Sequence, residues 1–259
     1  MPGTFRPTAA RRSANLSAGS LTCFGFAVEA SFGRRPMRYA IVRRFGDGTA
    51  DTWLFVTEPG TLAGTHVRIA EDRPRGRCEV RTFVPTMRSS LVLAERHVFG
   101  CLPLTEIGYL DLMAWRHPSL APVPEERPSD LSWSRWSGAE AYCHLGPAAT
   151  PGLTVTEAVD PGTGTVVARA VDRLGEPAHR WEVLEPGGPD AVGLPRLVRA
   201  CGAGGGWTEF RRVGAPFPVD PAHVDAGPER LLEDLGRHPR HRAGPAGGAS
   251  ASAGRGGGR

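Results

Sequence analysis

Short runs in which apolar and polar residues alternate, separated by turn residues, recur along most of the chain. In the run from Cys78 to Val84 the even positions are apolar or small, whereas Glu79 and Arg81 lie between them. Side chains alternate between the two faces of a strand, so this pattern is typical of a sheet with one buried and one hydrated face. Turn residues such as the Gly-Asp-Gly of residues 46–48 separate the runs, which predict about ten antiparallel strands in a meander.

The period changes once, near the middle of the chain. A strand is predicted over residues 89–99, and from Ile107 onward the apolar residues instead follow a helical spacing. Thr105 can accept a hydrogen bond from the free backbone N–H groups of a first turn and so serve as the N-cap. This pattern predicts a short helix from Thr105 to Trp115, inserted into the series of strands.

The two ends of the chain differ in composition from the part between them. Residues 1–19 are rich in Pro, Ser, Ala and Arg, and residues 237–259 consist mostly of Gly, Ala, Ser and Arg. Such segments lack the apolar side chains whose burial could offset the entropy of folding. We therefore expect a disordered leader over residues 1–19, one folded domain over residues 20–236 and a disordered tail over residues 237–259.

The apolar stretch that follows Arg11 and Arg12 is interrupted by Gly, Ser, Thr and Glu29. A secretory signal peptide needs a more continuous apolar region. We therefore expect a cytoplasmic protein, with export as the alternative. No apolar run reaches the ~18 residues that a membrane-spanning helix needs, so no transmembrane segment is expected.

The net charge of +4 is unevenly distributed. Residues 1–36 carry five Arg and one Glu, residues 237–259 carry five Arg and no acidic residue, and the part between them therefore carries −5. All 31 basic residues are Arg, which indicates a coding bias rather than selection for guanidinium chemistry. Nucleic-acid affinity needs cations on the folded surface, so we expect no nucleic-acid partner.

The spacing of cysteine and histidine residues does not fit a metal site. The five cysteines form no C-x-x-C pair, and the eight histidines show neither an H-x-H nor an H-E-x-x-H pattern. We therefore expect no metal and no cofactor. The cysteines are interpreted as buried free thiols, while a bridge between Cys78 and Cys101 and the oligomeric state stay open.

Several motifs occur in an order that is typical of one protein family. Between Arg81 and Leu112 a strand ends in an apolar-Pro step, basic residues follow, and an aromatic-Gly step leads into a helix that contains Asp and Leu. The residues in these positions are Phe83, Val84, Pro85, Arg88, Arg96, Phe99, Gly100, Tyr109, Asp111 and Leu112.

Further motifs extend the pattern in both directions. A strand–Pro–Gly–strand step spans residues 51–69, two hairpins span residues 159–184, and a closing segment spans residues 217–232. In this order the motifs resemble the outer-membrane lipoprotein-sorting (LolA/LolB-like) family over residues 21–235. The apolar link of residues 101–104 departs from the family, which has a polar link there.

The resemblance implies a mainly β fold: a strongly curved antiparallel sheet that forms a half-open β-barrel, with the short helix covering its concave face. It also implies that this face binds or carries a hydrophobic or amphiphilic, lipid-like ligand, with no covalent chemistry. Large apolar residues of the concave face are the candidate ligand-binding residues, and the alternative for each is that it packs the core. They are Trp53, Phe55, Phe83, Met87, Val98, Leu110, Trp115, Trp181 and Phe210.

A second group of candidates is polar and comprises His97, Glu106, Tyr109 and Asp111. A histidine near carboxylates could carry out general acid–base catalysis, so an enzyme of cyclase or isomerase type acting on a lipophilic metabolite is the alternative function. The interpretation that we prefer places His97 on an outward strand position and lets Asp111 cap a helix or pair with Arg96. No residue is therefore assigned as catalytic, and a protein-interaction module is the third alternative.

Overall fold

The computed structural model describes residues 13–32, 35–123, 135–136, 138–188, 191 and 193–237. Within these residues, thirteen strands form one antiparallel sheet in the order β6-β5-β4-β3-β2-β1-β13-β12-β11-β10-β9-β8-β7. The strands are β1 (Cys23–Phe32), β2 (Arg35–Phe45), β3 (Thr49–Glu58), β4 (His66–Asp72), β5 (Arg77–Phe83), β6 (Leu91–Val92), β7 (Ala121–Pro122), β8 (Glu140–Leu145), β9 (Leu153–Val159), β10 (Val166–Arg173), β11 (Glu176–Glu185), β12 (Leu197–Gly202) and β13 (Trp207–Pro218). The helices are η1 (Gly60–Leu62), α1 (Glu95–Val98), α2 (Tyr109–Leu112), α3 (Pro221–Ala226) and α4 (Pro228–Arg237).

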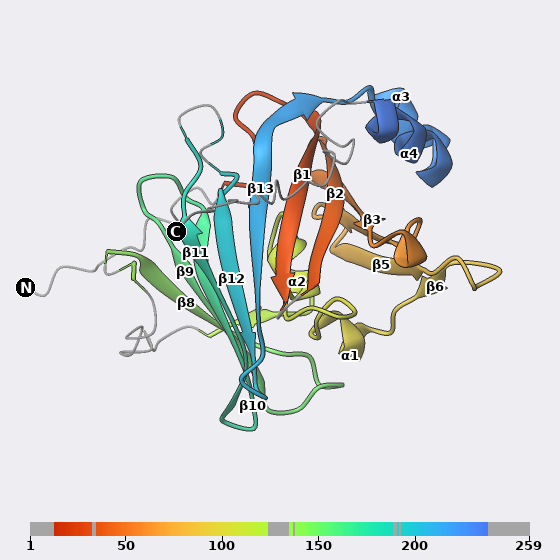
Figure 1. Cartoon of the computed structure of the whole chain (residues 1–259). Coiled ribbons are helices and arrows are strands. Elements are labelled where there is room, and N and C mark those ends of the chain that lie inside the picture. Colours follow the sequence, from red (N-terminus) through yellow and green to blue (C-terminus); the bar gives the residue numbers. More distant parts are fainter. Residues whose placement is uncertain are drawn as a thin grey trace, which may run out of the picture.

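The sheet is strongly curled (Figure 1) but is not closed into a barrel. Strand β1 pairs with β13, from Phe24 opposite Pro218 to Ser31 opposite Glu209, and this pairing joins the first half of the chain to the second. The sheet order ends at β6 on one side and at β7 on the other, and within the described residues these two short strands do not pair with each other. The prediction of a strongly curved antiparallel sheet that forms a half-open barrel is confirmed.

Residues 93–120, which connect β6 to β7, cross the concave face and are called the covering segment below. They contain the single-turn helices α1 and α2. The predicted helix from Thr105 to Trp115 is too long, because the backbone is extended at Gly108 and again at Met113, on either side of α2. The predicted strand over residues 89–99 is too long as well, because the chain leaves the sheet after β6 and enters α1. No helix in the described ranges is long and apolar enough to span a membrane.

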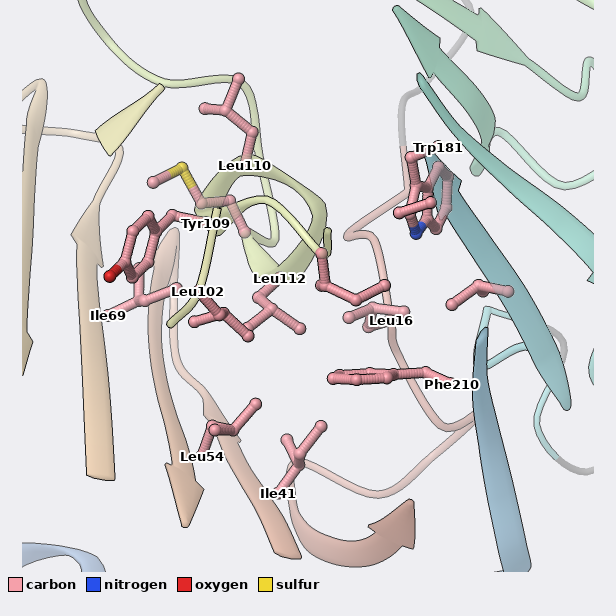
Figure 2. Packing of buried hydrophobic residues seen from close by; sticks show 14 of the residues in the cluster. Leu16, Ile41, Leu54, Ile69, Leu102, Tyr109, Leu110, Leu112, Trp181 and Phe210 are labelled. Carbon is pink, nitrogen blue, oxygen red and sulfur yellow. The ribbon is translucent and has the colours of Figure 1, made fainter. Parts of the chain in front are cut away.

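The covering segment supplies much of the core on the concave side. Figure 2 shows Leu102 and Leu112 of this segment pointing toward Ile41 and Leu54 of the sheet. All four side chains are nearly inaccessible to solvent. Because burying one such side chain is worth about 1.5–3 kcal/mol, packing alone contributes strongly to holding the segment in place. The prediction of a short covering helix inserted mid-sheet is confirmed in α2.

Strand β3 is apolar on both faces. Leu54 and Val56 belong to the inner core, whereas Trp53 and Phe55 belong to a separate cluster on the outer face. Helices α3 and α4 cover this outer cluster, and Leu231 of α4 is fully buried in it. The expectation that Trp53 and Phe55 face the concave side is therefore wrong, because successive side chains of a strand point to opposite faces.

Residues 13–19 belong to the folded body, although the sequence places them in a disordered leader. Asn15 and Leu16 are buried, and the Asn15 N–H donates to a backbone carbonyl of the covering segment (2.8 Å). The boundary expected at residue 20 is corrected accordingly, because these residues pack on the concave side of the sheet. Residues 1–12 and 238–259, which the prediction also treats as disordered, lie outside the described residues.

Candidate ligand-binding site

The predicted ligand-binding residues differ in their burial and in the face of the sheet on which they lie. Val98, Leu110, Trp181 and Phe210 lie in the inner core, Phe83, Met87 and Trp115 are partly buried, and Trp53 and Phe55 lie on the outer face. The nine residues therefore do not line one common cavity.

The inner core leaves little space for a ligand. A cavity of about 30 Å³ remains between the covering segment and the sheet, and its lining includes Leu16, Leu112 and Trp181. Sites for small organic ligands have volumes of roughly 300–1,000 Å³. A lipid-like molecule therefore fits beneath the covering segment only if that segment moves.

A larger cleft lies at the open edge of the sheet, between strands β4–β6 and the covering segment, and is called the open-edge cleft below. Its volume is about 760 Å³. The apolar part of its lining comes from Val80, Val92, Leu93, Val98 and Pro118. Of these five residues only Val98 is among the predicted ligand-binding residues, because valines and leucines of the strand runs carry a weaker signal in the sequence than large aromatic residues do.

Two charged side chains of the sheet bind the backbone of the covering segment. Arg43 of β2 is fully buried and donates to the Leu112 carbonyl (2.6 Å). Glu71 of β4 accepts the N–H groups of Ala114 (2.8 Å) and Trp115 (3.0 Å). Burial lowers the pKa of Arg43 to about 10, and the nearby Glu71 carboxylate opposes that shift. Opening the segment would break these charge-assisted hydrogen bonds.

Asp111 of α2 is the centre of a buried ionic network. Its Oδ1 accepts a hydrogen bond from Arg169 (2.9 Å), and its Oδ2 accepts hydrogen bonds from His179 (2.8 Å) and the Gly108 N–H (2.7 Å). Arg169 also donates to Glu157 (2.8 Å). Glu157, Arg169 and His179 belong to β9, β10 and β11, so the network ties α2 to the second half of the sheet.

The network also fixes the protonation of its members. Burial alone would lower the pKa of His179, but the Asp111 carboxylate raises it to about 10. Burial would raise the pKa of Asp111, and His179 and Arg169 lower it instead. At neutral pH His179 is thus an imidazolium, and it cannot accept a proton from Cys101, whose Sγ lies 4.0 Å from Nδ1. This geometry serves ion pairing better than general base catalysis.

The predicted polar cluster does not assemble. His97 lies on an exposed part of α1 and receives a hydrogen bond from Arg96 (3.2 Å), while the Glu106 N–H donates to Thr208 of β13 (2.9 Å). Asp111 lies elsewhere, and its cationic partners come from the sheet rather than from Arg96. The pairing of Asp111 with Arg96 is therefore wrong, whereas its role within α2 agrees with the preferred interpretation.

Arg169 and Glu157 were missed, although the sequence carries a signal for them. Each is a charged residue at a position where alternation predicts an inward side chain, in line with Val155 and Val159 in β9 or with Val171 in β10. The two residues lie directly opposite each other in the pairing of β9 with β10. A buried charge almost always has a partner, so each of these residues indicates that an opposite charge lies nearby.

No protein-family model and no curated protein matches the chain, but solved structures do. A domain from Vibrio parahaemolyticus that is assigned as an outer membrane lipoprotein-sorting protein has a TM-score of 0.63 at 11% identity, over 82% of this chain and 91% of that one. A LolA superfamily protein from Nitrosomonas europaea has a TM-score of 0.55 at 12% identity, over 82% and 93% of the two chains. The protein has a LolA-like fold.

A third similar structure is that of a DUF1329 family protein from Desulfovibrio piger, with a TM-score of 0.57 at 9% identity over 75% of this chain and 85% of that one. Identities this low establish the shared fold and do not transfer the role of any residue. The resemblance drawn from the motifs of the sequence is confirmed at the level of the LolA-like fold.

The LolA-like fold also corrects the expected location. A cytoplasmic protein is predicted because the apolar stretch near the N-terminus is interrupted by polar residues. The Vibrio domain of the same fold is assigned to the sorting of outer membrane lipoproteins, and the prediction of a cytoplasmic protein is contradicted by this comparison.

The raised pKa of His179 predicts that stability falls with rising pH. A group whose pKa is raised on folding contributes stability that is complete below its unfolded pKa of 6.5 and is lost as the pH rises through about 10. Between roughly pH 7 and pH 8.5 we expect the free energy of unfolding to fall by about 1–2 kcal/mol. Urea unfolding at both pH values measures this fall. Burial lowers the pKa of His66 and His117, which makes stability rise with pH, but this opposing effect is mostly complete below pH 7 and is small in this window.

His179→Gln is the control for this pH dependence, because it removes the titrating group and keeps a side chain of similar polarity. The variant should be less stable than the wild type at pH 7 and should show little further loss at the higher pH. A fall of the same size in the variant and the wild type would assign the dependence to other groups.

Proposed function

We propose that this LolA-like protein binds and carries a hydrophobic or amphiphilic, lipid-like molecule without covalent chemistry of its own. The observation that carries this proposal is the open-edge cleft, whose apolar lining continues into the core beneath the covering segment. Val80 and Val98 belong both to the cleft and to that core. A chain that enters here exchanges water for apolar contacts, a gain of roughly 25 cal/mol per Å² of surface buried.

The similar structures support the same proposal. The Vibrio domain is assigned to the sorting of outer membrane lipoproteins, which carry apolar lipid chains. A half-open sheet suits such a cargo, because a cleft that is open at one edge admits a chain without closing around it. We propose on this ground that the protein acts as an exported protein on a lipid or on a lipid-bearing partner.

A catalytic function has less support from the site. The best-placed ionisable groups, Asp111 and His179, are bonded to each other and to Arg169 in a closed network. In the open-edge cleft Ser119 Oγ lies 2.7 Å from His117 Nδ1. Within the described residues, however, no carboxylate is hydrogen-bonded to this imidazole, so the pair lacks the orienting group that an activated nucleophile needs. Binding is therefore the function that these residues support best.

The test of this function is the uptake of an apolar probe. The purified protein should bind N-phenyl-1-naphthylamine and raise its fluorescence. Val92→Asp places an unpaired carboxylate on the apolar floor of the cleft and should weaken probe binding about tenfold or more. Because Val92 is 48% exposed, the variant should fold normally, which circular dichroism and urea unfolding would check.

Leu145→Asp is the matched control, because Leu145 is 50% exposed and lies on β8, away from the cleft. It should bind the probe like the wild type. Native mass spectrometry of the protein purified from its own host provides a second readout and should reveal a retained lipophile. Absence of probe uptake by the wild type, or equal loss in both variants, would contradict the proposed site.

A further inference from the structure

The mouth of the open-edge cleft carries a concentration of positive charge. A smaller pocket of about 320 Å³ adjoins the cleft, and the two share part of their lining. Arg73 and Arg77 from the β4–β5 hairpin and Arg116 from the covering segment line this smaller pocket. Within the described part of the chain, none of these three guanidinium groups forms an ion pair.

The carboxylates of the same pocket are already engaged. Glu71 accepts the backbone N–H groups of Ala114 and Trp115, so its charge faces the covering segment. Asp72 is paired with Arg75 (2.8 Å), and this hydrogen bond lowers the pKa of the Asp72 carboxyl group. Within the described residues neither carboxylate forms a hydrogen bond with Arg73, Arg77 or Arg116, and Arg77 acts on Asp72 only through its charge, which also lowers the pKa of Asp72.

The neighbouring cleft differs from this pocket. Of its carboxylates, Glu79 is paired with Arg81 (2.5 Å), and Glu95 lies in the first turn of α1. Its floor is apolar and comes from the valine and leucine side chains described above. The apolar floor of the open-edge cleft therefore leads to the three unpaired arginines of the smaller pocket. This arrangement is complementary to a molecule with an apolar chain and an anionic head.

We propose that the open-edge cleft selects amphiphiles with an anionic headgroup. The oxyanion, a carboxylate or a phosphate, would bind Arg73, Arg77 and Arg116, and the acyl chain would lie along Val80 and Val92. A guanidinium group suits this role, because its planar array of donors can bind two oxygens of a carboxylate or phosphate at once. This inference rests on the proposed function and narrows its ligand class.

The test compares three molecules with the same eighteen-carbon chain below their critical micelle concentrations. Oleate and oleoyl lysophosphatidate carry an anionic head, and monoolein carries a neutral one. We expect the wild type to bind both anions at least about tenfold more tightly than monoolein. The triple variant Arg73→Gln/Arg77→Gln/Arg116→Gln should lose this preference and keep its affinity for monoolein. Added salt should weaken the binding of the anions, because these arginines are open to solvent.

A triple variant elsewhere on the surface is the matched control for net charge. Arg199→Gln/Arg211→Gln/Arg230→Gln removes the same three charges from sites outside both cavities and should keep the preference for anions. Equal affinities of the wild type for oleate and monoolein, or equal losses in the two triple variants, would overturn the headgroup selection and leave the proposed function standing. Failure to bind any of the three molecules would contradict the proposed function itself. Inorganic phosphate that binds as tightly as lysophosphatidate would show a simple anion site and overturn the amphiphile assignment.

Discussion

Asp111→Asn is expected to lower the free energy of unfolding by about 3–5 kcal/mol, the range for breaking a buried ion pair. The amide keeps the shape of the side chain but loses the charge that Arg169 and His179 share. The NH₂ group of the asparagine is a donor, so it would also replace an oxygen that now accepts a hydrogen bond from Arg169 or His179. All three side chains are at most 7% exposed, so water cannot replace the lost interactions. Urea unfolding at pH 7 measures the change.

Asp172→Asn is the control for this substitution. Asp172 also pairs with an arginine, Arg180, at 2.7 Å, but the two side chains are 24% and 27% exposed. A partly hydrated pair of this kind contributes about 1 kcal/mol or less. A loss as small as this in Asp111→Asn would mean that the network does not anchor α2, and that packing alone holds the covering segment on the sheet.

The β architecture could be predicted because its signal is local. Alternation along each run identifies a strand, and the turns between the runs fix an antiparallel meander. The same rule does not say which face of a strand points inward. Strand β3 is apolar on both faces, because helices α3 and α4 bury Trp53 and Phe55 from outside while the covering segment buries Leu54 and Val56 from inside. Assigning Trp53 and Phe55 to the inner face was therefore beyond what the pattern supports.

The covering segment shows a second limit of local patterns. Ile107 and Leu110 have helical spacing, but a segment that crosses a core in an irregular path must also bury a residue every three or four positions. Side chains of the sheet decide its conformation. Arg43 donates to the Leu112 carbonyl and Glu71 accepts the Ala114 N–H, two backbone groups that would form hydrogen bonds within the helix if α2 were longer. The length of α2 is thus set by contacts with residues of the sheet, and it cannot be predicted from the sequence of residues 93–120 alone.

The ionic network was out of reach for a related reason. Asp111 lies 58 residues from Arg169 and 68 residues from His179, and no spacing rule connects them. What the sequence does contain is the inward position of Arg169 and of Glu157 in their strands. The open-edge cleft likewise depends on how the covering segment lies against strands β4–β6. The kind of ligand could be proposed from the fold, whereas the residues that contact it depend on tertiary structure.

Glu71→Ala is expected to loosen the covering segment and to increase the uptake of apolar molecules. The Ala114 N–H is buried and would lose its acceptor, the Trp115 N–H would lose its own, and Arg43 would lose the carboxylate nearest to its buried charge. An unsatisfied buried donor costs about 1–3 kcal/mol, so the variant should be destabilised by about 2–4 kcal/mol. Amide hydrogen exchange should accelerate over residues 112–116, and N-phenyl-1-naphthylamine should bind with a larger fluorescence increase.

Two further variants separate the release of the segment from a change of charge in the cleft. Glu79→Ala removes a carboxylate that also lines the cleft, but Glu79 bonds the exposed Arg81 and no backbone group of the covering segment. It should change neither hydrogen exchange nor probe uptake. Glu71→Gln keeps one acceptor oxygen and should fall between the wild type and Glu71→Ala in both measurements. Unchanged exchange over residues 112–116 in Glu71→Ala would mean that the packing of the segment on the inner core suffices to hold it, and a ligand would then be confined to the open-edge cleft.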